Sequence, residues 1–176
     1  MSIHDWPIRI GSMVVSVVVV VFLAFGVALA GGKTGSGHHF PLVLATNWGS
    51  NTISLVDVDA GQELAVIEVG LKPYDIKVEP TGRFAFVTNS GNSDISIVDI
   101  QAMLEADRIP VGTSPRDIIL SKDAKRAVVA NSGDNSISVV DIASKHKQEL
   151  FRVTVGTIPY GVALANDDQL ALNRST

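Results

Sequence analysis

The sequence repeats a stretch of 13 residues three times, and this repetition restricts the possible folds more than any other feature. The copies read ATNWGSNTISLVD at 45–57, VTNSGNSDISIVD at 87–99 and VANSGDNSISVVD at 129–141. The first asparagines of the copies, Asn47, Asn89 and Asn131, follow one another at intervals of 42 residues. A fixed period of about 40 residues is typical of proteins in which one small structural unit stacks on the next.

One unit, taken as residues 73–112, is expected to form four short antiparallel strands joined by tight turns. Turn clusters of Gly, Pro, Asn and Ser separate stretches rich in Phe, Val and Ile. The part at 101–107 is also compatible with a helical turn, but its counterpart at 63–69 is strand-like, so both are assigned to strands. The stretch Ile95-Ser96-Ile97-Val98 is apolar apart from one small residue, which indicates a sheet covered on both faces. Sheets repeated radially, as in a β-propeller, are covered in this way.

The repeats resemble the YVTN-type β-propeller repeat, whose name-giving strand reads Phe86-Val87-Thr88-Asn89 here. The resemblance covers residues 42–165 and includes a second shared motif, Val-Gly-x-x-Pro. The prolines of that motif are Pro73, Pro115 and Pro159. The resemblance implies an all-β fold, a partial propeller of four-stranded antiparallel blades, in a family whose members are secreted or lie on the cell surface and commonly have seven blades. The departures from the repeat include Trp48 in the first copy and two extra residues at 144–148 in the third.

The chain divides into a leader at 1–30, a linker at 31–39 and a repeat region at 40–176. The repeat region contains units near 42–72, 73–114 and 115–158 and a stub at 159–176. At 42 residues per unit, the 146 residues after Ala30 give about 3.5 blades, fewer than the about four of the smallest propellers. Three outcomes stay open: a truncated fragment of a longer propeller, a ring completed by self-association of two copies, or an arc with capped ends.

The leader is apolar from 13 to 30 apart from Ser16 and Gly26, and it ends in Ala28-Leu29-Ala30. A positive residue before the apolar run and small residues after it are typical of a secretory signal peptide. The run is also just long enough for an N-terminal apolar helix that anchors the chain in a membrane. A helix buried in the core is the remaining interpretation. Both of the first two place the repeats outside the cytoplasm, in the periplasm, on the cell surface or in the medium.

Composition excludes several classes of function. The net charge is −4, and no basic patch of the kind that nucleic-acid binding needs is present. The absence of cysteine excludes disulfides, thiol catalysis, iron–sulfur clusters and attachment of c-type haem. His38 and His39 in the linker lack a third ligand at a usual spacing for a metal, and no G-x-S-x-G nucleophile motif occurs. We therefore assign no cofactor, no metal site and no catalytic residue.

The residues that recur in every repeat are expected to be structural, because a binding site needs a residue once. Asn47, Asn89 and Asn131 are expected to take left-handed backbone geometry at a turn and to bond to the nearby backbone. The aspartates that end the next strand are expected to accept hydrogen bonds from backbone N–H groups of the following turn. These aspartates are Asp57, Asp99 and Asp141. The serines in the middle of the same strands, Ser54, Ser96 and Ser138, are expected where neighbouring sheets approach closely.

The residues after each motif proline differ between repeats and are better candidates for binding. They are Tyr74, Asp75, Arg116, Asp117 and Tyr160. In a propeller these positions open the innermost strand of a blade, beside the central channel. Together they are predicted to bind an anionic or sugar-like ligand. The alternative is structural: Arg116 and Asp117 pair with neighbours, and Tyr74 and Tyr160 pack.

The leader and the repeats favour an extracytoplasmic β-propeller module that is not an enzyme and that binds a protein or small molecule or acts as a surface scaffold. The alternative is a lactonase-like propeller enzyme, or an accessory of a periplasmic oxidoreductase. A third interpretation is a truncated product without a function of its own. A fold does not by itself decide between them.

Overall fold

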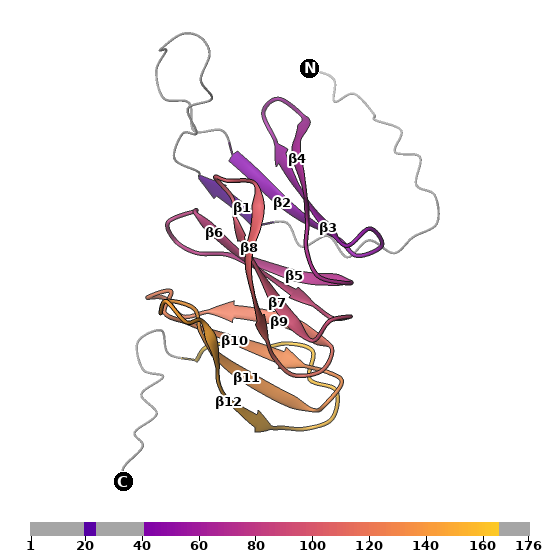
Figure 1. Cartoon of the computed structure of the whole chain (residues 1–176), viewed down its shortest axis with the longest axis vertical. Helices are drawn as coiled ribbons and strands as arrows, with labels where there is room; N and C mark the ends of the chain where they lie inside the picture. Colours follow the sequence, from indigo (N-terminus) through magenta and orange to yellow (C-terminus); the bar gives the residue numbers. More distant parts are fainter. Residues whose placement is uncertain (1–19, 24–40, 166–176) are drawn as a thin grey trace.

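The computed structural model describes residues 20–23 and 41–165, and this part of the chain consists of three four-stranded antiparallel sheets. Figure 1 shows the sheets following one another along the long axis in chain order. We number them blades 1 to 3. Blade 1 contains β1 (Val20–Leu23), β2 (Pro41–Asn47), β3 (Thr52–Asp57) and β4 (Gln62–Glu68). Blade 2 contains β5 (Pro73–Val78), β6 (Phe84–Asn89), β7 (Asp94–Asp99) and β8 (Leu104–Pro110). Blade 3 contains β9 (Pro115–Leu120), β10 (Arg126–Asn131), β11 (Ser136–Asp141) and β12 (Gln148–Thr154).

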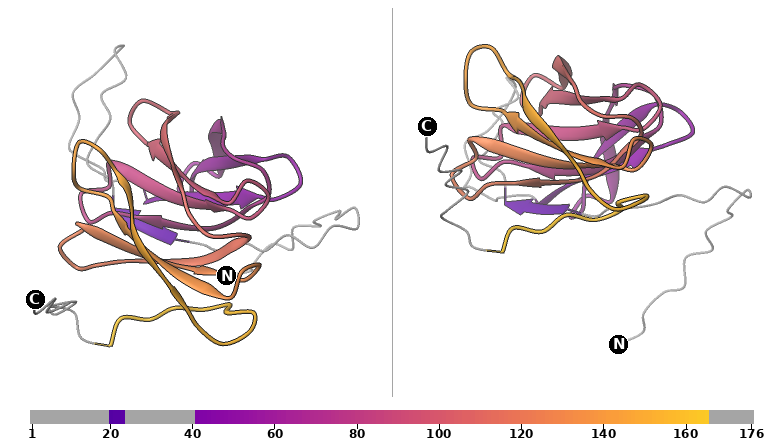
Figure 2. Two further views of the ribbon diagram at one scale, coloured as in Figure 1. Left: turned by 60° about the horizontal axis from the view of Figure 1, so that its bottom comes forward. Right: turned by 90° about the horizontal axis from the view of Figure 1, so that it is seen from below.

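The predicted all-β fold, a partial propeller of four-stranded blades, is confirmed. Within each blade the strands pair in the order of the sequence, and each repeat forms its own sheet. β5, the first strand of blade 2, packs against β2 of blade 1 and against β9, the first strand of blade 3, so it lies between the two neighbouring blades. The last strands, β4, β8 and β12, are mostly exposed. Figure 2 shows the same stack from two further directions.

β1 is the opening strand of blade 1 and comes from the leader, outside the first repeat unit at 42–72. Its backbone pairs with β2 from Val20↔Leu44 to Leu23↔Pro41. The rest of the leader, the linker and residues 166–176 lie outside the described residues, so the apolar helix expected over 13–30 stays a prediction apart from these four extended residues. In the described ranges no helix is long and apolar enough to span a membrane.

Two apolar cores hold the blades together. Between blades 1 and 2, buried residues such as Ile53 and Leu55 pack near Ile76 and Val87. Between blades 2 and 3, a second cluster is formed by Phe86, Ile97 and Ile109 together with Ile118, Val129 and Val140. Burial of one such side chain contributes about 1.5–3 kcal/mol. A blade is therefore stabilised mainly by its neighbours, which explains why its strands are apolar on both faces.

The repeated asparagines work differently from the prediction. The left-handed residue of each turn is Asn51, Ser93 or Asn135, with φ of 61°, 60° and 55°, four positions after the repeated asparagine. The side chain of Asn89 instead donates from Nδ2 to Ser96 Oγ at 2.7 Å and to Asp94 Oδ1 at 2.6 Å. The expectation of left-handed geometry at Asn47, Asn89 and Asn131 was therefore wrong, since none of them has a positive φ. Their side-chain amides bond to side chains of the next strand instead of to the nearby backbone.

The serines of blades 2 and 3, expected where neighbouring sheets approach closely, bind the link from the preceding blade rather than a neighbouring sheet. Ser96 Oγ accepts the Gly70 N–H at 3.2 Å, and Ser138 Oγ accepts the Gly112 N–H at 3.3 Å. Each glycine belongs to the Val-Gly-x-x-Pro link that leads from one blade into the next. A serine hydroxyl thus satisfies a buried backbone donor that a strand ladder does not reach.

The repeated aspartates accept hydrogen bonds from the next turn, as predicted. Asp57 Oδ1 accepts the Ala60 N–H at 2.9 Å, and Asp99 Oδ1 accepts the Ala102 N–H at 3.0 Å. Asp141 Oδ1 accepts the N–H groups of residues 143 and 144, both at 3.0 Å. These bonds lower the pKa of Asp141, since an ionised carboxylate accepts them best.

Candidate functional site

Three of the predicted site residues meet at one end of the inner strands. Tyr74 and Arg116 stand near the starts of β5 and β9, as expected, whereas Tyr160 lies in a segment that forms no strand within the described residues up to 165. The guanidinium carbon of Arg116 lies 4.5 Å from the centre of the Tyr74 ring and 5.1 Å from the centre of the Tyr160 ring. The three residues follow the motif prolines of three successive repeats. Arg116 is half-buried, and its Nε donates to Ser132 Oγ at 3.3 Å. We call this group the Arg116 stack; its contacts are cation–π interactions across repeat boundaries.

Threonine hydroxyls hold the backbone under this stack. Thr46 Oγ1 donates to the Tyr74 carbonyl at 3.2 Å, and Thr88 Oγ1 donates to the Arg116 carbonyl at 2.6 Å. The third repeat has Ala130 at the matching position, which offers no hydroxyl to Tyr160. Tyr160 is also the more open side of the stack, with 56% of its surface exposed.

The two predicted aspartates join adjacent repeats. Asp75 Oδ2 accepts the Ile118 N–H at 3.1 Å, and Asp117 Oδ2 accepts the Val162 N–H at 2.8 Å. Each carboxylate therefore binds the backbone three positions after the motif proline of the following repeat. This arrangement agrees with the structural alternative for Asp117, in which it pairs with a neighbour, and Asp75 makes the equivalent bond.

Lys77 lies beside these carboxylates. Its Nζ donates to Asp75 Oδ2 at 2.7 Å and lies 4.0 Å from Asp117 Oδ1. Asp75 is 4% exposed, and burial raises the pKa of its carboxyl. A hydrogen bond with Asp117 raises this pKa further, while Lys77 and the Ile118 N–H act in the opposite direction. The pKa of Asp75 stays above its ordinary value, so the ionised carboxylate depends on the ammonium.

Replacing Lys77 by methionine is expected to lower the free energy of unfolding by about 1–2 kcal/mol near neutral pH, because a buried carboxylate loses its partner. The side chain of Lys77 is 32% exposed, which keeps the loss moderate. A carboxyl whose pKa is raised in the folded state destabilises that state while ionised, and the cost disappears as the pH falls through that pKa. The loss relative to wild type should therefore shrink as the pH is lowered from about 7 to about 4.

Urea unfolding of both proteins across this pH range measures the effect. Lys125→Met is the matched control, since Lys125 pairs with Asp123 at 3.6 Å while both side chains are largely exposed. Its effect on the free energy of unfolding should be much smaller than that of Lys77→Met, because solvent screens an exposed ion pair. A Lys77→Met loss that does not change with pH would contradict the assignment of the raised pKa to Asp75.

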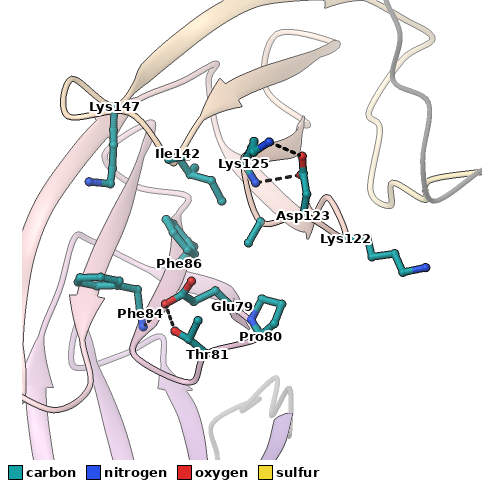
Figure 3. Close-up of a pocket in the computed structure, with 12 residues that line it drawn as sticks. Glu79, Pro80, Thr81, Phe84, Phe86, Lys122, Asp123, Lys125, Ile142 and Lys147 are labelled. Carbon is teal, nitrogen blue, oxygen red and sulfur yellow. Dashed lines mark hydrogen bonds and ion pairs between the residues drawn. The ribbon is translucent and has the colours of Figure 1, made fainter.

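A pocket of about 540 Å³ lies between blades 2 and 3, at the opposite end of β9 from the Arg116 stack. Three segments line it: 79–86 of blade 2, and 122–125 and 142–147 of blade 3. Figure 3 shows Phe84 and Glu79 on one side, Ile142 and Lys147 facing them, and Lys125 beside Asp123. We call it the interblade pocket. The sequence-based predictions missed it.

One sequence feature marks the interblade pocket. Lys147 belongs to the loop at 144–148, where the third repeat has two extra residues. That departure was noted in the sequence, but the other lining segments come from separate turns, and their meeting depends on how two blades stack.

The described residues offer little for metal chemistry. Among them no group of three His, Asp or Glu side chains is placed to hold a metal ion. The linker histidines His38 and His39 lie outside the described part, so this finding does not bear on them. What the described surface does offer is a guanidinium between two aromatic rings and a pocket with lysines at its edge.

A model of the YNCE-like beta-propeller family matches residues 29–169, most of the chain. This match confirms the expectation that the chain belongs to a β-propeller family. It does not test the more specific resemblance to the YVTN-type repeat. None of the curated proteins matches the chain.

Several solved structures share the fold. Hydrazine synthase of Kuenenia stuttgartiensis is 30% identical, with a TM-score of 0.63 over 68% of this chain and 34% of that one. A candidate 6-phosphogluconolactonase of Bacteroides fragilis is 17% identical, with a TM-score of 0.60 over 67% of this chain and 37% of that one. The dihydro-heme d1 dehydrogenase NirN is 16% identical, with a TM-score of 0.59 over 70% of this chain and 27% of that one. The chain spans 27–37% of the length of these three structures.

Proposed function

Because the chain belongs to the YNCE-like β-propeller family, we propose that it is a non-catalytic binding module or surface scaffold that acts outside the cytoplasm. The apolar run at 13–30 with its Ala28-Leu29-Ala30 ending supports that location. The YVTN-type likeness of Phe86–Asn89, whose family members are secreted or lie on the cell surface, supports it as well.

The observation that carries the binding proposal is the Arg116 stack. The two tyrosine rings flank the guanidinium, so its N–H edge is the part left for a ligand. Among the described residues only Nε of this side chain has a hydrogen-bond partner. A planar guanidinium edge fits a carboxylate or phosphate with two parallel hydrogen bonds. The aromatic rings offer surfaces on which an apolar sugar face packs. The ligand is therefore an anion, and an acidic sugar fits both features.

Nuclear magnetic resonance titration of the labelled full chain with glucuronate, with glucose as the neutral arm, tests this proposal. Glucuronate is expected to shift the amide signals of Ser132 and Ile118, and glucose to shift them at least tenfold less at equal concentration. Arg116→Met should weaken the binding of glucuronate about tenfold or more. Arg83→Met is the control, because Arg83 also lies over an aromatic ring, at 4.8 Å from Phe84, outside the stack. Equal losses in the two variants, or no saturable shift with glucuronate, would overturn the proposal.

The alternative, a lactonase-like enzyme or an accessory of an oxidoreductase, takes its support from the relatives named as a candidate 6-phosphogluconolactonase and as a dehydrogenase. Their identities to this chain are low, and the likeness concerns the fold. A lactone hydrolysis assay on the purified chain separates the two functions. Hydrolysis that Arg116→Ala abolishes would favour the enzyme over the binding module.

A further inference from the structure

We propose that the interblade pocket is a second binding site, which accepts a small organic anion with an apolar body, an alkyl or aryl carboxylate. It lies at the other end of β9 from the Arg116 stack, so the two sites are separate and the second does not depend on the first. Its volume of about 540 Å³ is within the range of small-molecule sites.

The wall of the pocket on blade 2 is aromatic. Phe86 is buried in the core between blades 2 and 3, and Phe84 is half-buried and packs against the same core. Ile142 of blade 3 faces the two rings from the opposite side (Figure 3). Part of this apolar surface stays open to solvent, and burying it under a ligand body gives a favourable free energy.

The acidic residues of the pocket are already bound to the protein. Glu79 Oε1 accepts the Phe84 N–H at 3.2 Å and the hydroxyl of Thr81. Asp123 Oδ1 accepts the hydroxyl of Ser121 at 2.7 Å and the Lys125 N–H at 3.1 Å. These hydrogen bonds lower the pKa of Asp123 and direct its charge into its own turn.

Two of the three lysines that line the pocket, Lys125 and Lys147, are freer to meet a ligand. Lys147 has no hydrogen bond or ion pair within the described residues. The ammonium of Lys125 lies 3.6 Å from Asp123 Oδ2 with both side chains exposed, an ion pair that contributes little and is easily exchanged. Figure 3 shows Lys122 pointing away from the other side chains, so Lys125 and Lys147 are the cations of the site. A carboxylate at this edge would form charge-assisted hydrogen bonds with them.

The other repeats do not reproduce this combination. One repeat earlier, the segment 122–125 corresponds to Pro80, Thr81, Gly82 and Arg83, which carry one positive charge in place of two lysines. Phe84 corresponds to Leu42 and Arg126 in the neighbouring repeats, and Lys147 comes from the loop with two extra residues. Features needed for blade stacking recur in every repeat, whereas these occur once. Such single occurrence is expected of a ligand site.

Nuclear magnetic resonance titration of the labelled full chain with 4-phenylbutyrate tests the site. Two comparison ligands are titrated in the same way: 4-phenylbutanol, which lacks the negative charge, and acetate, which lacks the apolar body. We expect saturable shifts of the amide signals of Ala124 and Ala143 with 4-phenylbutyrate, and binding at least tenfold weaker for each of the other two. Lys147→Gln should weaken the binding of 4-phenylbutyrate about fivefold, and Lys125→Gln by a similar factor.

Lys145→Gln is the matched control, because it removes the same charge from an exposed position of the same loop that does not line the pocket. It should change the affinity less than twofold. A control that loses as much affinity as Lys147→Gln, equal binding of the alcohol and the acid, or shifts that do not saturate would overturn the proposal. Failure here leaves the glucuronate result at the Arg116 stack unaffected, since Arg116 takes no part in this titration.

Discussion

Gly112→Ala is expected to lower the free energy of unfolding by about 3 kcal/mol. A Cβ atom at this position would lie 2.4 Å from both Cγ and Nδ2 of Asn131. Asn131 is fully buried and cannot easily move away, because its Nδ2 donates to Ser136 Oγ at 3.0 Å and to Ser138 Oγ at 2.8 Å. The added methyl therefore forces blades 2 and 3 apart or breaks these hydrogen bonds. Urea unfolding of the variant measures the loss.

Gly156→Ala is the matched control for Gly112→Ala, because the third copy of the motif places a glycine at the equivalent position. Gly156 occupies the same place in the Val-Gly-x-x-Pro motif, but no described atom lies within 4 Å of a Cβ built on it. The substitution should change stability by no more than about 0.5 kcal/mol. Gly70→Ala should behave like Gly112→Ala, since its Cβ would meet Asn89 at 2.4 Å. Similar values for Gly112→Ala and Gly156→Ala would show that the blades are not stacked as described.

Asn89→Asp is expected to destabilise the chain by about 3 kcal/mol or more near neutral pH. Asn89 is fully buried, and its amide donates to the carboxylate of Asp94 at 2.6 Å. The substitution places two carboxylates in contact at a buried position, where one of them has to take up a proton. Burial already raises the pKa of Asp94, and the Asn89 amide counteracts that rise. The variant should therefore recover part of its stability as the pH falls toward about 4.

Asn47→Asp is the matched control for this substitution. The side chain of Asn47 bonds to the hydroxyls of Thr52 and Ser54, at 3.1 and 2.8 Å, and it is only half-buried. A hydroxyl can rotate and donate to the new carboxylate, so the loss should be about 1 kcal/mol. The double variant Asn89→Asp with Asp94→Asn should regain most of the stability, because one carboxylate again faces an amide. Equal losses at Asn47 and Asn89 would contradict this view of the buried contact.

The fold was predictable because the sequence contains three similar copies of the same structural unit. Each strand of blades 2 and 3 has a counterpart about one period away, and such a counterpart was the reason for assigning 101–107 to a strand. The strand there, β8, runs from Leu104 to Pro110, and residues 101–103 form the turn before it, so the type of element was predicted but its start was placed three residues too early. The pairing of β1 with β2 was not predictable, because residues 20–23 belong to a leader whose composition resembles a membrane segment. The role of the repeated asparagines was misjudged for a different reason. Their partners, such as Ser96 and Asp94, are on the next strand, and pattern alone does not show which side chains face each other.

The position of the candidate site was predictable from the sequence. Which of its residues are free to bind a ligand and which hold the fold together was not. The first residues after the motif prolines do converge, and Arg116 lies between Tyr74 and Tyr160. Asp75 and Asp117, however, recur one period apart, and recurrence is typical of a structural role; the structure uses both carboxylates to bind the backbone of the next repeat. The interblade pocket could not be predicted, because its lining comes from turns of two blades whose relative placement depends on packing of the cores.

The account depends on each repeat closing its own sheet and contacting its neighbours through side chains. Nuclear Overhauser contacts between backbone protons of the labelled full chain test this most directly. We expect strand-pair contacts inside a repeat, such as Ile95 with Ile109, and none between the backbones of β8 and β9. The Ile118 amide should lie near Asp75, 43 residues earlier, as a contact between repeats. Continuous backbone pairing from β8 into β9 would mean that the repeats merge into one sheet, and it would contradict the account.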